Sequence, residues 1–211
     1  MNKIITTDIC VIGAGSGGLS VAAGAVQMGA KVVLIEKGKM GGDCLNTGCV
    51  PSKALLAAGH AAENARKASR FGVSTGPVEV DFGRAIDHVH SVIAGIAPHD
   101  SVERFEELGC TVIQAEARFT GPGEVVAGDT TIKAKRFVIA TGSRAAVPSI
   151  PGLETVCYFT NETIFENRVR PEHLIIIGGG PIGLEMAQAH RQLGAKVTVI
   201  EMGTILPKDD P

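Results

Sequence analysis

The chain has 211 residues, and its 20 basic and 22 acidic side chains give a formal net charge of −2. This balance excludes a protein that binds nucleic acid through bulk positive charge. With 45% hydrophobic and 20% charged residues, the composition is that of a globular protein with a sizeable core, not of a disordered chain. The length predicts one large domain or slightly more than one.

An uncharged stretch runs from Ile9 to Ala30 and has the length of a membrane-spanning helix. Its six glycines favour a strand, a turn and a helix instead. The N-terminal letters MNKIITTD lack the layout of a signal peptide, so we predict a cytoplasmic protein. In that compartment five cysteines are not a structural disulfide framework, and a close pair among them indicates redox chemistry or a metal.

Residues 8–38 and 173–203 are two copies of one pattern, with 14 of 31 positions identical. Each copy predicts an apolar strand buried on both faces, a Gly-x-Gly-x-x-Gly turn, a helix, and a second strand that ends at an acid, Glu36 or Glu201. The glycines of the two turns are Gly13, Gly15 and Gly18 in the first copy and Gly178, Gly180 and Gly183 in the second.

This spacing suits a dinucleotide. The first glycine permits a tight turn, the second lets a pyrophosphate approach the backbone, and the third lets helix and strand pack closely. The phosphates bind at the helix N-terminus, and the acid accepts hydrogen bonds from a ribose. An incidental glycine-rich turn is the alternative, and the repeated context disfavours it. The chain therefore has two dinucleotide sites, or one and the beginning of another, and Glu201 favours NADH over NADPH because a carboxylate repels a 2′-phosphate.

Cys44 and Cys49 are separated by four residues and precede an alanine-rich helical stretch. In an ideal helix, residues i and i+5 lie about 8.6 Å apart at Cα, whereas a disulfide needs less than about 7 Å. A bridge would require a distorted first turn, which Gly48 and Pro51 permit, and such strain makes a bridge easier to reduce. A thiol at a helix N-terminus also has its thiolate favoured.

Two other interpretations of this pair are zinc and coincidence. Zinc needs a second pair of ligands, and no cysteine or histidine stands close enough to Cys10, Cys110 or Cys157 to complete one, so we predict no metal. The redox disulfide is the favoured interpretation. Cys10, in the apolar first strand, is predicted to be an inert core residue.

Between the repeats the pattern predicts helices and then a short meander. Helix is expected over residues 54–70 and 81–108, with a break at Pro98 and a cap at Asp100–Ser101. The expected strands are residues 110–119, 124–127 and 130–134, followed by a separate buried strand over 137–141. The six scattered histidines are predicted to be surface or capping residues: His60, His88, His90, His99, His173 and His190.

The segment GGDCLNTGCVPSK, residues 41–53, resembles the active-site segment of the flavin-dependent pyridine nucleotide-disulfide oxidoreductases, the group of dihydrolipoamide dehydrogenase, glutathione reductase and mercuric reductase. The resemblance extends over essentially the whole chain, through GAGSGG near the N-terminus, ATGS at 140–143 and GGGPIGLE at 178–185. Asp43, where most members have Thr, and Thr47, where Val is usual, depart from the pattern of lipoamide dehydrogenase proper.

The resemblance implies roles for individual residues. Cys44 corresponds to the interchange thiol, Cys49 to the thiol against the flavin, and Lys53 to a lysine near the flavin that pairs with Glu185. Without the resemblance, the less favoured alternative for Lys53 is a solvated helix residue. The residues implied to bind FAD are Gly13, Gly15, Gly18, Glu36, Lys37, Gly42, Thr141 and Gly142; those implied to bind NAD, with NADP less suited, are Gly178, Gly180, Gly183 and Glu201.

The fold implied is α/β: a Rossmann-like FAD-binding domain of the glutathione reductase type, with a three-stranded β-meander insertion, over residues 1–147. The beginning of a second Rossmann-like, NAD(P)-binding domain follows over residues 148–211. Because later segments of the family do not follow Pro211, we expect a truncated chain that is inactive alone.

The enzyme implied passes electrons between NAD(H), FAD and a Cys44–Cys49 disulfide, as dihydrolipoamide dehydrogenase does. Its substrate would be a small dithiol, a disulfide or a lipoyl group. The full-length parent would be a homodimer, and we expect neither a nucleic acid nor a membrane as a partner. The alternatives are a mercuric reductase, which reduces Hg(II) with NAD(P)H, and an inactive nucleotide-binding fragment.

Overall fold

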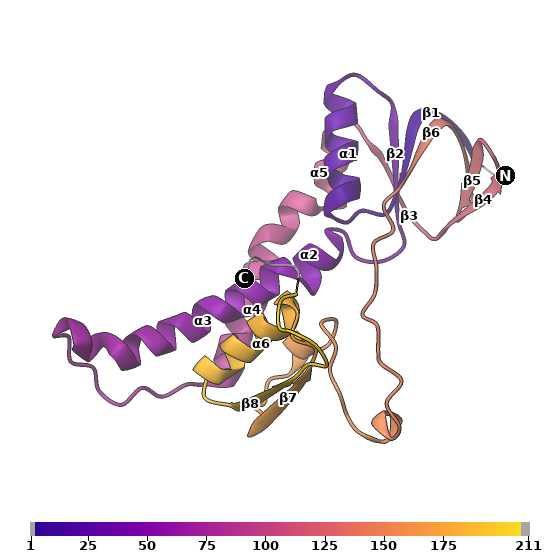
Figure 1. Ribbon diagram of the computed structural model, residues 1–211. Helices are drawn as coiled ribbons and strands as arrows, with labels where there is room; N and C mark the ends of the chain where they lie inside the picture. Colours follow the sequence, from indigo (N-terminus) through magenta and orange to yellow (C-terminus); the bar gives the residue numbers. More distant parts are fainter. Residues whose placement is uncertain (1–2, 208–211) are drawn as a thin grey trace. The chain divides into compact units, whose positions relative to one another are not determined.

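The computed structural model describes residues 3–207, which form two compact units (Figure 1). The first unit comprises the described residues up to Asn46 together with Ala94–Ala146, and the second comprises Thr47–Ile93 together with the described residues from Val147. Residues 1–2 and 208–211, at the ends of the two predicted domains, lie outside the described residues.

A six-stranded sheet in the order β3-β2-β1-β6-β5-β4 forms the first unit. The neighbouring strands β3, β2, β1 and β6 are parallel to one another, whereas β6, β5 and β4 pair antiparallel. The sheet is therefore mixed, and the unit has the α/β class that we predicted. The elements of this part of the chain are β1 (Lys3–Ile12), α1 (Ser16–Gln27), β2 (Val32–Glu36), α2 (Gly42–Asn46), η2 (Ala97–Asp100), α5 (Val102–Glu107), β3 (Thr111–Gln114), β4 (Ala117–Gly121), β5 (Glu124–Ala127) and β6 (Thr130–Ile139).

Alternation along β1 and β2 distributes apolar side chains to both faces of this sheet. Val11 and Leu34 pack with Leu19 of α1 and Phe105 of α5 on one face. Cys10, Val33 and Ile35 pack against the meander on the other. Both central strands are therefore buried on both faces, as the uninterrupted apolar runs predict.

Two strand boundaries differ from the prediction. The expected strand over residues 110–119 is divided by a bend at Ala115 and Glu116 into β3, which pairs with β2, and β4, which begins the meander. The expected strands over 130–134 and 137–141 are one strand, β6. No glycine or proline stands between them, and β6 pairs continuously with β1 from Lys3↔Thr130 to Ile12↔Ile139. A single strand thus serves both the meander and the parallel sheet.

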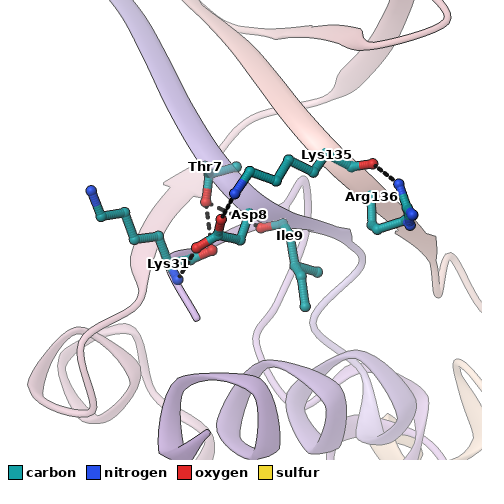
Figure 2. Close-up of polar contacts among 6 residues, drawn as sticks. All are labelled: Thr7, Asp8, Ile9, Lys31, Lys135 and Arg136. Carbon is teal, nitrogen blue, oxygen red and sulfur yellow. Dashed lines mark hydrogen bonds and ion pairs between the residues drawn. The ribbon is translucent and has the colours of Figure 1, made fainter. Parts of the chain in front are cut away.

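Asp8 fixes the register of the three central strands (Figure 2). Its Oδ2 accepts from the backbone N–H of Lys31, and its Oδ1 accepts from the Lys135 ammonium of β6, at 2.9 and 2.7 Å. Thr7 Oγ1 donates to the Lys31 carbonyl at 2.7 Å. The hydrogen bond from Lys135, followed by that from Lys31, lowers the pKa of Asp8. These contacts join the start of β2 to β1 and β6, so the carboxyl ends of all three strands reach the same edge of the sheet.

Helices make up most of the second unit. Leu55 of α3, Ile86 and Val89 of α4, and Met186 and Leu193 around α6 are buried together in its core. The described helices include none that is long and apolar enough to cross a membrane. The elements of this part of the chain are α3 (Cys49–Lys67), η1 (Ala68–Phe71), α4 (Phe82–Ile96), η3 (Leu153–Thr155), η4 (Ile164–Glu166), β7 (His173–Ile177), α6 (Pro181–Gln192) and β8 (Lys196–Ile200).

The helix predictions agree with these bounds. Residues 54–70 lie within α3 and η1, and residues 81–108 form α4, η2 and α5. Pro98 lies in the short η2 that interrupts the helices, as expected from its ring. Ser101 is the predicted cap of α5, since its Oγ accepts from the Arg104 N–H at 3.2 Å.

The second repeat differs from the first in burial. We predicted that the first strand of this repeat is buried on both faces, and for β7 this prediction is wrong. Leu174 and Ile176 pack on the core, but the side chains of Ile175 and Ile177 are 56% and 54% exposed. Within the described residues β7 pairs only with β8, and helices cover one face of this two-stranded sheet. The sequence pattern shows that both faces are apolar, but not that both are covered.

The prediction of a surface or capping role is also wrong for His190, whose side chain is 1% exposed in the core of the second unit. Its ring lies 5.6 Å from that of Phe82, and its Nδ1–H donates to the Met186 carbonyl at 2.8 Å. Burial lowers the pKa of His190 below its ordinary value of 6.5, and the bond to Met186 only partly opposes this shift. His190 is therefore neutral in the folded protein at neutral pH.

We expect His190 to make stability depend on pH. Because the folded-state pKa is lowered, the unfolded chain takes up the proton first as the pH falls below 6.5, so the free energy of unfolding declines there. Urea unfolding of the second unit between pH 7.5 and 5 measures this decline. His190→Leu should flatten it, whereas the exposed control His99→Leu should not. Equal slopes for the two variants would contradict the assignment.

Candidate functional site

The first glycine turn can only be built from glycine. Gly13 has φ +104°, and a Cβ there would lie 2.2 Å from the Ala140 carbonyl oxygen. A Cβ on Gly18 would lie 1.8 Å from the Gly13 carbonyl oxygen. These clashes show that helix α1 passes directly against the turn, and that the turn passes directly against the chain that leaves β6.

The N-terminus of α1 is open for an anion. Its N-cap is Gly15, which supplies no side-chain cap, so the first N–H groups of the helix are available to a ligand. A Cβ on Gly15 would lie 3.8 Å from the Cα of Gly42, with no other atom within 4 Å. A Cβ on Gly42 would lie only 2.6 Å from the Cα of Gly15. Backbone from two glycine segments thus lies together at this end of the helix.

Glu36, the predicted ribose acid at the end of β2, braces the turn. Its Oε2 accepts from the Ala14 N–H at 2.6 Å, and its Oε1 accepts from the Gly38 N–H at 2.7 Å. A carboxylate oxygen has a second lone pair, so both oxygens can still accept from a ribose hydroxyl. The acid therefore holds the turn in shape and still presents acceptors.

Seven of the eight residues predicted to bind FAD line one cavity of about 440 Å³ in the first unit. Gly18 is the exception, since it packs beneath Gly13. Lining residues that the sequence did not indicate come mainly from the β3–β4 connection and from the chain after β6. The full lining is Ile12, Gly13, Gly15, Ile35, Glu36, Lys37, Gly42, Asp43, Ala115, Glu116, Ala117, Ala140, Thr141, Gly142, Ser143 and Arg144.

These residues fit a dinucleotide such as FAD. Unpaired helix N–H groups and side-chain-free glycine backbone suit a pyrophosphate, and a braced carboxylate suits a ribose. Lys37 and Arg144 place cations at the same cavity, where Lys37 pairs with Glu116 at 3.3 Å.

The second repeat reproduces this arrangement. Glu201 accepts from the Gly179 N–H at 2.7 Å and from the Gly203 N–H at 3.0 Å, the positions equivalent to Ala14 and Gly38. These two backbone bonds, in that order, lower the pKa of Glu201, so it is ionised at neutral pH. A Cβ on Gly183 would lie 2.2 Å from the Gly178 carbonyl oxygen, and Gly180 is the N-cap of α6 without a side-chain cap.

Lys53 and Glu185 are brought into contact across 132 positions of sequence. Lys53 Nζ donates to Glu185 Oε1 at 2.6 Å, which joins the first turns of α3 and α6. Burial raises the pKa of Glu185, but the hydrogen bond from Lys53, with a further one from Ser52, outweighs burial and lowers it. Glu185 is therefore a carboxylate, and its contact holds the Lys53 side chain in place near the start of α3.

Cys44 lies within the short helix α2, and Cys49 is the first residue of the 19-residue helix α3. The chain between them is not helical at Thr47 and Gly48, so the ideal-helix spacing that opposed a bridge does not apply. Cys44 is half-buried, and Cys49 is exposed at a helix N-terminus that favours negative charge.

The other cysteines lie elsewhere. Cys10 is fully buried in β1, as predicted, and burial raises its pKa to about 11. Cys110 is also buried, and burial raises its pKa. Cys157 is exposed. Among residues 3–207 no group of three or more Cys, His, Asp and Glu side chains is arranged to hold a metal ion.

Residues 7–210 match the family described as "Pyridine nucleotide-disulphide oxidoreductase". The chain belongs to this family. The family comprises flavin-dependent enzymes, and the Rossmann-like fold and its glycine turns are those that membership requires.

Individual relatives bear different names. A "Mercuric reductase" of Streptomyces lividans is 38% identical over 210 residues, with 97% of this chain and 44% of that protein covered. A "Dihydrolipoyl dehydrogenase" of Acholeplasma laidlawii is 36% identical over 209 residues, with 96% and 62% covered. The solved "Cu(II) complex of HOCl-induced flavoprotein disulfide reductase RclA from Escherichia coli" superposes with a TM-score of 0.80 at 29% identity, with 96% and 44% covered. The chain thus spans less than two thirds of each of these proteins.

Proposed function

We propose that the protein is an FAD-dependent NAD(P)H:disulfide oxidoreductase of the dihydrolipoamide dehydrogenase type. The observation that carries this proposal is a single arrangement in one chain. In sequence order, a glycine turn held by Glu36, a cysteine pair, Lys53, and a second glycine turn held by Glu201 follow one another, and Lys53 forms an ion pair with Glu185. We further propose a cytoplasmic, homodimeric full-length protein, with residues 1–147 and 148–211 belonging to its FAD and NAD(P) domains.

The glycine turns supply the cofactor sites. FAD would be held by the first glycine turn and its acid: Gly13, Gly15, Gly18 and Glu36. The resemblance adds four further residues, which line the 440 Å³ cavity: Lys37, Gly42, Thr141 and Gly142. Gly178, Gly180, Gly183 and Glu201 would hold NAD(H), and the ionised Glu201 disfavours a 2′-phosphate. FAD, when bound, supplies a two-electron carrier between a pyridine nucleotide and a dithiol.

Cys44 and Cys49 would carry out thiol–disulfide exchange with substrate. A substrate thiolate attacks Cys44 Sγ of the disulfide, the bond to Cys49 breaks, and Cys49 leaves as a thiolate. The second substrate thiolate attacks the substrate sulfur of this mixed disulfide and releases Cys44. The substrate dithiol becomes a disulfide and its two electrons pass to the cysteine pair. Its two protons, released when its thiolates form, pass to the solvent or to the reduced cysteine pair.

Lys53 supports the charge that this exchange creates. Cys49 and Lys53 are four residues apart in α3 and therefore lie on one face of the helix. Glu185 holds the Lys53 ammonium at 2.6 Å, and the N-terminus of α3 adds its own positive partial charge. Both positive groups therefore lie at the end of α3 where Cys49 stands.

Hg(II) reduction is the second candidate. It is favoured by the identity to relatives named mercuric reductase, 38% in Streptomyces lividans and 37% in Bacillus cereus. The same cysteine pair would then deliver two electrons to a thiolate-bound Hg(II).

The full-length protein, purified with added FAD, tests these proposals. We expect a bound-flavin visible spectrum, bleaching by NADH, and NAD⁺-dependent oxidation of dihydrolipoamide. Turnover with Hg(II) and NAD(P)H but none with dihydrolipoamide would replace the first candidate by the second. No turnover of dihydrolipoamide or Hg(II) by the full-length protein would contradict the proposed function. A colourless 211-residue chain with unreactive thiols would support the inactive nucleotide-binding fragment.

A further inference from the structure

A groove of about 460 Å³ lies in the second unit, where the C-terminal end of α6 meets α3. It is lined by Glu63, Arg66, Arg191, Gln192 and Gly194. We propose that this groove binds a small tetrahedral oxyanion, phosphate or sulfate, through Arg191 and Arg66. The proposal does not depend on the proposed enzymatic function.

The groove is separate from the second nucleotide turn. Gly180 caps the N-terminus of α6, whereas Gln192 is its last residue. A helix of twelve residues is about 18 Å long, so an anion in the groove lies a full helix length away from phosphates bound at the glycine turn.

The charged side chains that line the groove carry a net positive charge, because it has two arginines and one acid. Glu63, its only lining acid, is already engaged, because Oε2 pairs with Arg66 at 3.2 Å and Oε1 pairs with Lys67 at 2.8 Å. These contacts lower the pKa of Glu63. Within residues 3–207 no acidic side chain pairs with Arg191, so its guanidinium retains its donors for a ligand.

The helix C-terminus beside the groove would by itself repel an anion, but two arginines offset it. Arg66 Nη1 donates to the Gln192 carbonyl at 2.6 Å, and Arg170 Nη1 donates to the Gly194 carbonyl. Each guanidinium group has five N–H donors, so these hydrogen bonds use only some of them. The carbonyls are thereby satisfied, and the remaining N–H groups of Arg66 are available on a side chain that is already fixed.

The groove wall is also rigid. Gly59 of α3 allows α6 to approach closely, since a Cβ there would lie 2.8 Å from Gln192 Oε1 and 3.3 Å from the Ala189 carbonyl oxygen. Gln192, whose carbonyl anchors Arg66, is therefore held against α3. Arginine guanidinium groups match the geometry of tetrahedral oxyanions, and Arg66, which is already held by Glu63 and Gln192, costs little ordering on binding.

Titration of the ¹⁵N-labelled, FAD-supplemented protein with inorganic phosphate tests the proposal by NMR. Chloride keeps the ionic strength constant, and sulfate serves as the competitor. We expect saturable shifts at the Arg191 Nε–Hε and Gly194 amide signals. Arg191→Gln should weaken this binding at least about tenfold, whereas the exposed first-unit control Arg118→Gln should leave it unchanged.

Phosphate can also bind at the open helix N-termini, so the site of the shifts decides the result. Shifts confined to Gly15 and Gly180 would overturn the proposal, as would equal affinities in the two variants or an equal response to chloride alone. Arg191 is exposed and makes no ion pair within the described residues that its replacement would break, so a folded Arg191→Gln protein is expected. Because the signals report binding and not turnover, failure here would leave the proposed oxidoreductase function unaffected.

Discussion

Gly18→Ala is expected to destabilise the first unit by more than about 3 kcal/mol and to abolish FAD binding. The added Cβ would lie 1.8 Å from the Gly13 carbonyl oxygen, an atom of the backbone that cannot move without opening the turn. Helix α1 would then separate from β1, and its N-terminal N–H groups would no longer face the cavity. Urea unfolding and flavin fluorescence titration measure the two effects.

Gly24→Ala is the matched control in the same helix. Nothing lies within 4 Å of a Cβ at Gly24, so this change should stabilise α1 by up to about 1 kcal/mol. Gly183→Ala, the equivalent change in the second repeat, should weaken NADH binding and leave FAD binding intact, since its clash is with Gly178. If Gly18→Ala retained wild-type stability and flavin, the described turn geometry would be wrong.

The second large effect is expected on turnover. Cys49→Ser and Cys44→Ser should each lower dihydrolipoamide oxidation at least about a thousandfold, because exchange needs both sulfurs. The two variants should differ in what they trap. Cys49→Ser leaves Cys44 as a single thiol, which can attack a linear disulfide substrate; a mixed disulfide at Cys44 forms as the other half of the substrate leaves as a thiol, and it is detected as an added mass on the intact protein.

Cys157→Ser is the control for these variants, since Cys157 is an exposed cysteine outside the proposed machinery. Its turnover should equal that of the unchanged protein. Equal losses in all three variants would indicate a general effect of cysteine removal, and full activity of Cys49→Ser would refute the exchange mechanism.

The nucleotide turns were predictable because their chemistry is local. A glycine spacing and an acid at a fixed distance are enough to place Gly13 and Glu36 together, and the braced carboxylates follow that spacing in both repeats. The contact between Lys53 and Glu185 was expected from the family resemblance alone. It joins two helices far apart in sequence, and no periodicity indicates it.

The rest depends on tertiary packing. The cavity residues Ala115, Glu116 and Arg144 lie in connections whose positions follow from strand order, which the sequence does not state. His190 looks polar in the sequence but lies on the face of α6 that packs against Phe82. The sequence did not predict the exposure of Ile175, because an apolar strand sequence indicates that both faces can be buried but does not indicate which elements cover them.

The most direct measurement of the proposed redox centre is peptide mapping of the FAD-loaded protein after rapid thiol blocking. Trypsin releases residues 40–53, which contain both Cys44 and Cys49. We expect this peptide to be unblocked and lighter by two hydrogen atoms when the protein is oxidised, and to carry two blocking groups after NADH is added. Two blocked cysteines in the air-oxidised protein, unchanged by NADH, would contradict a redox-active disulfide.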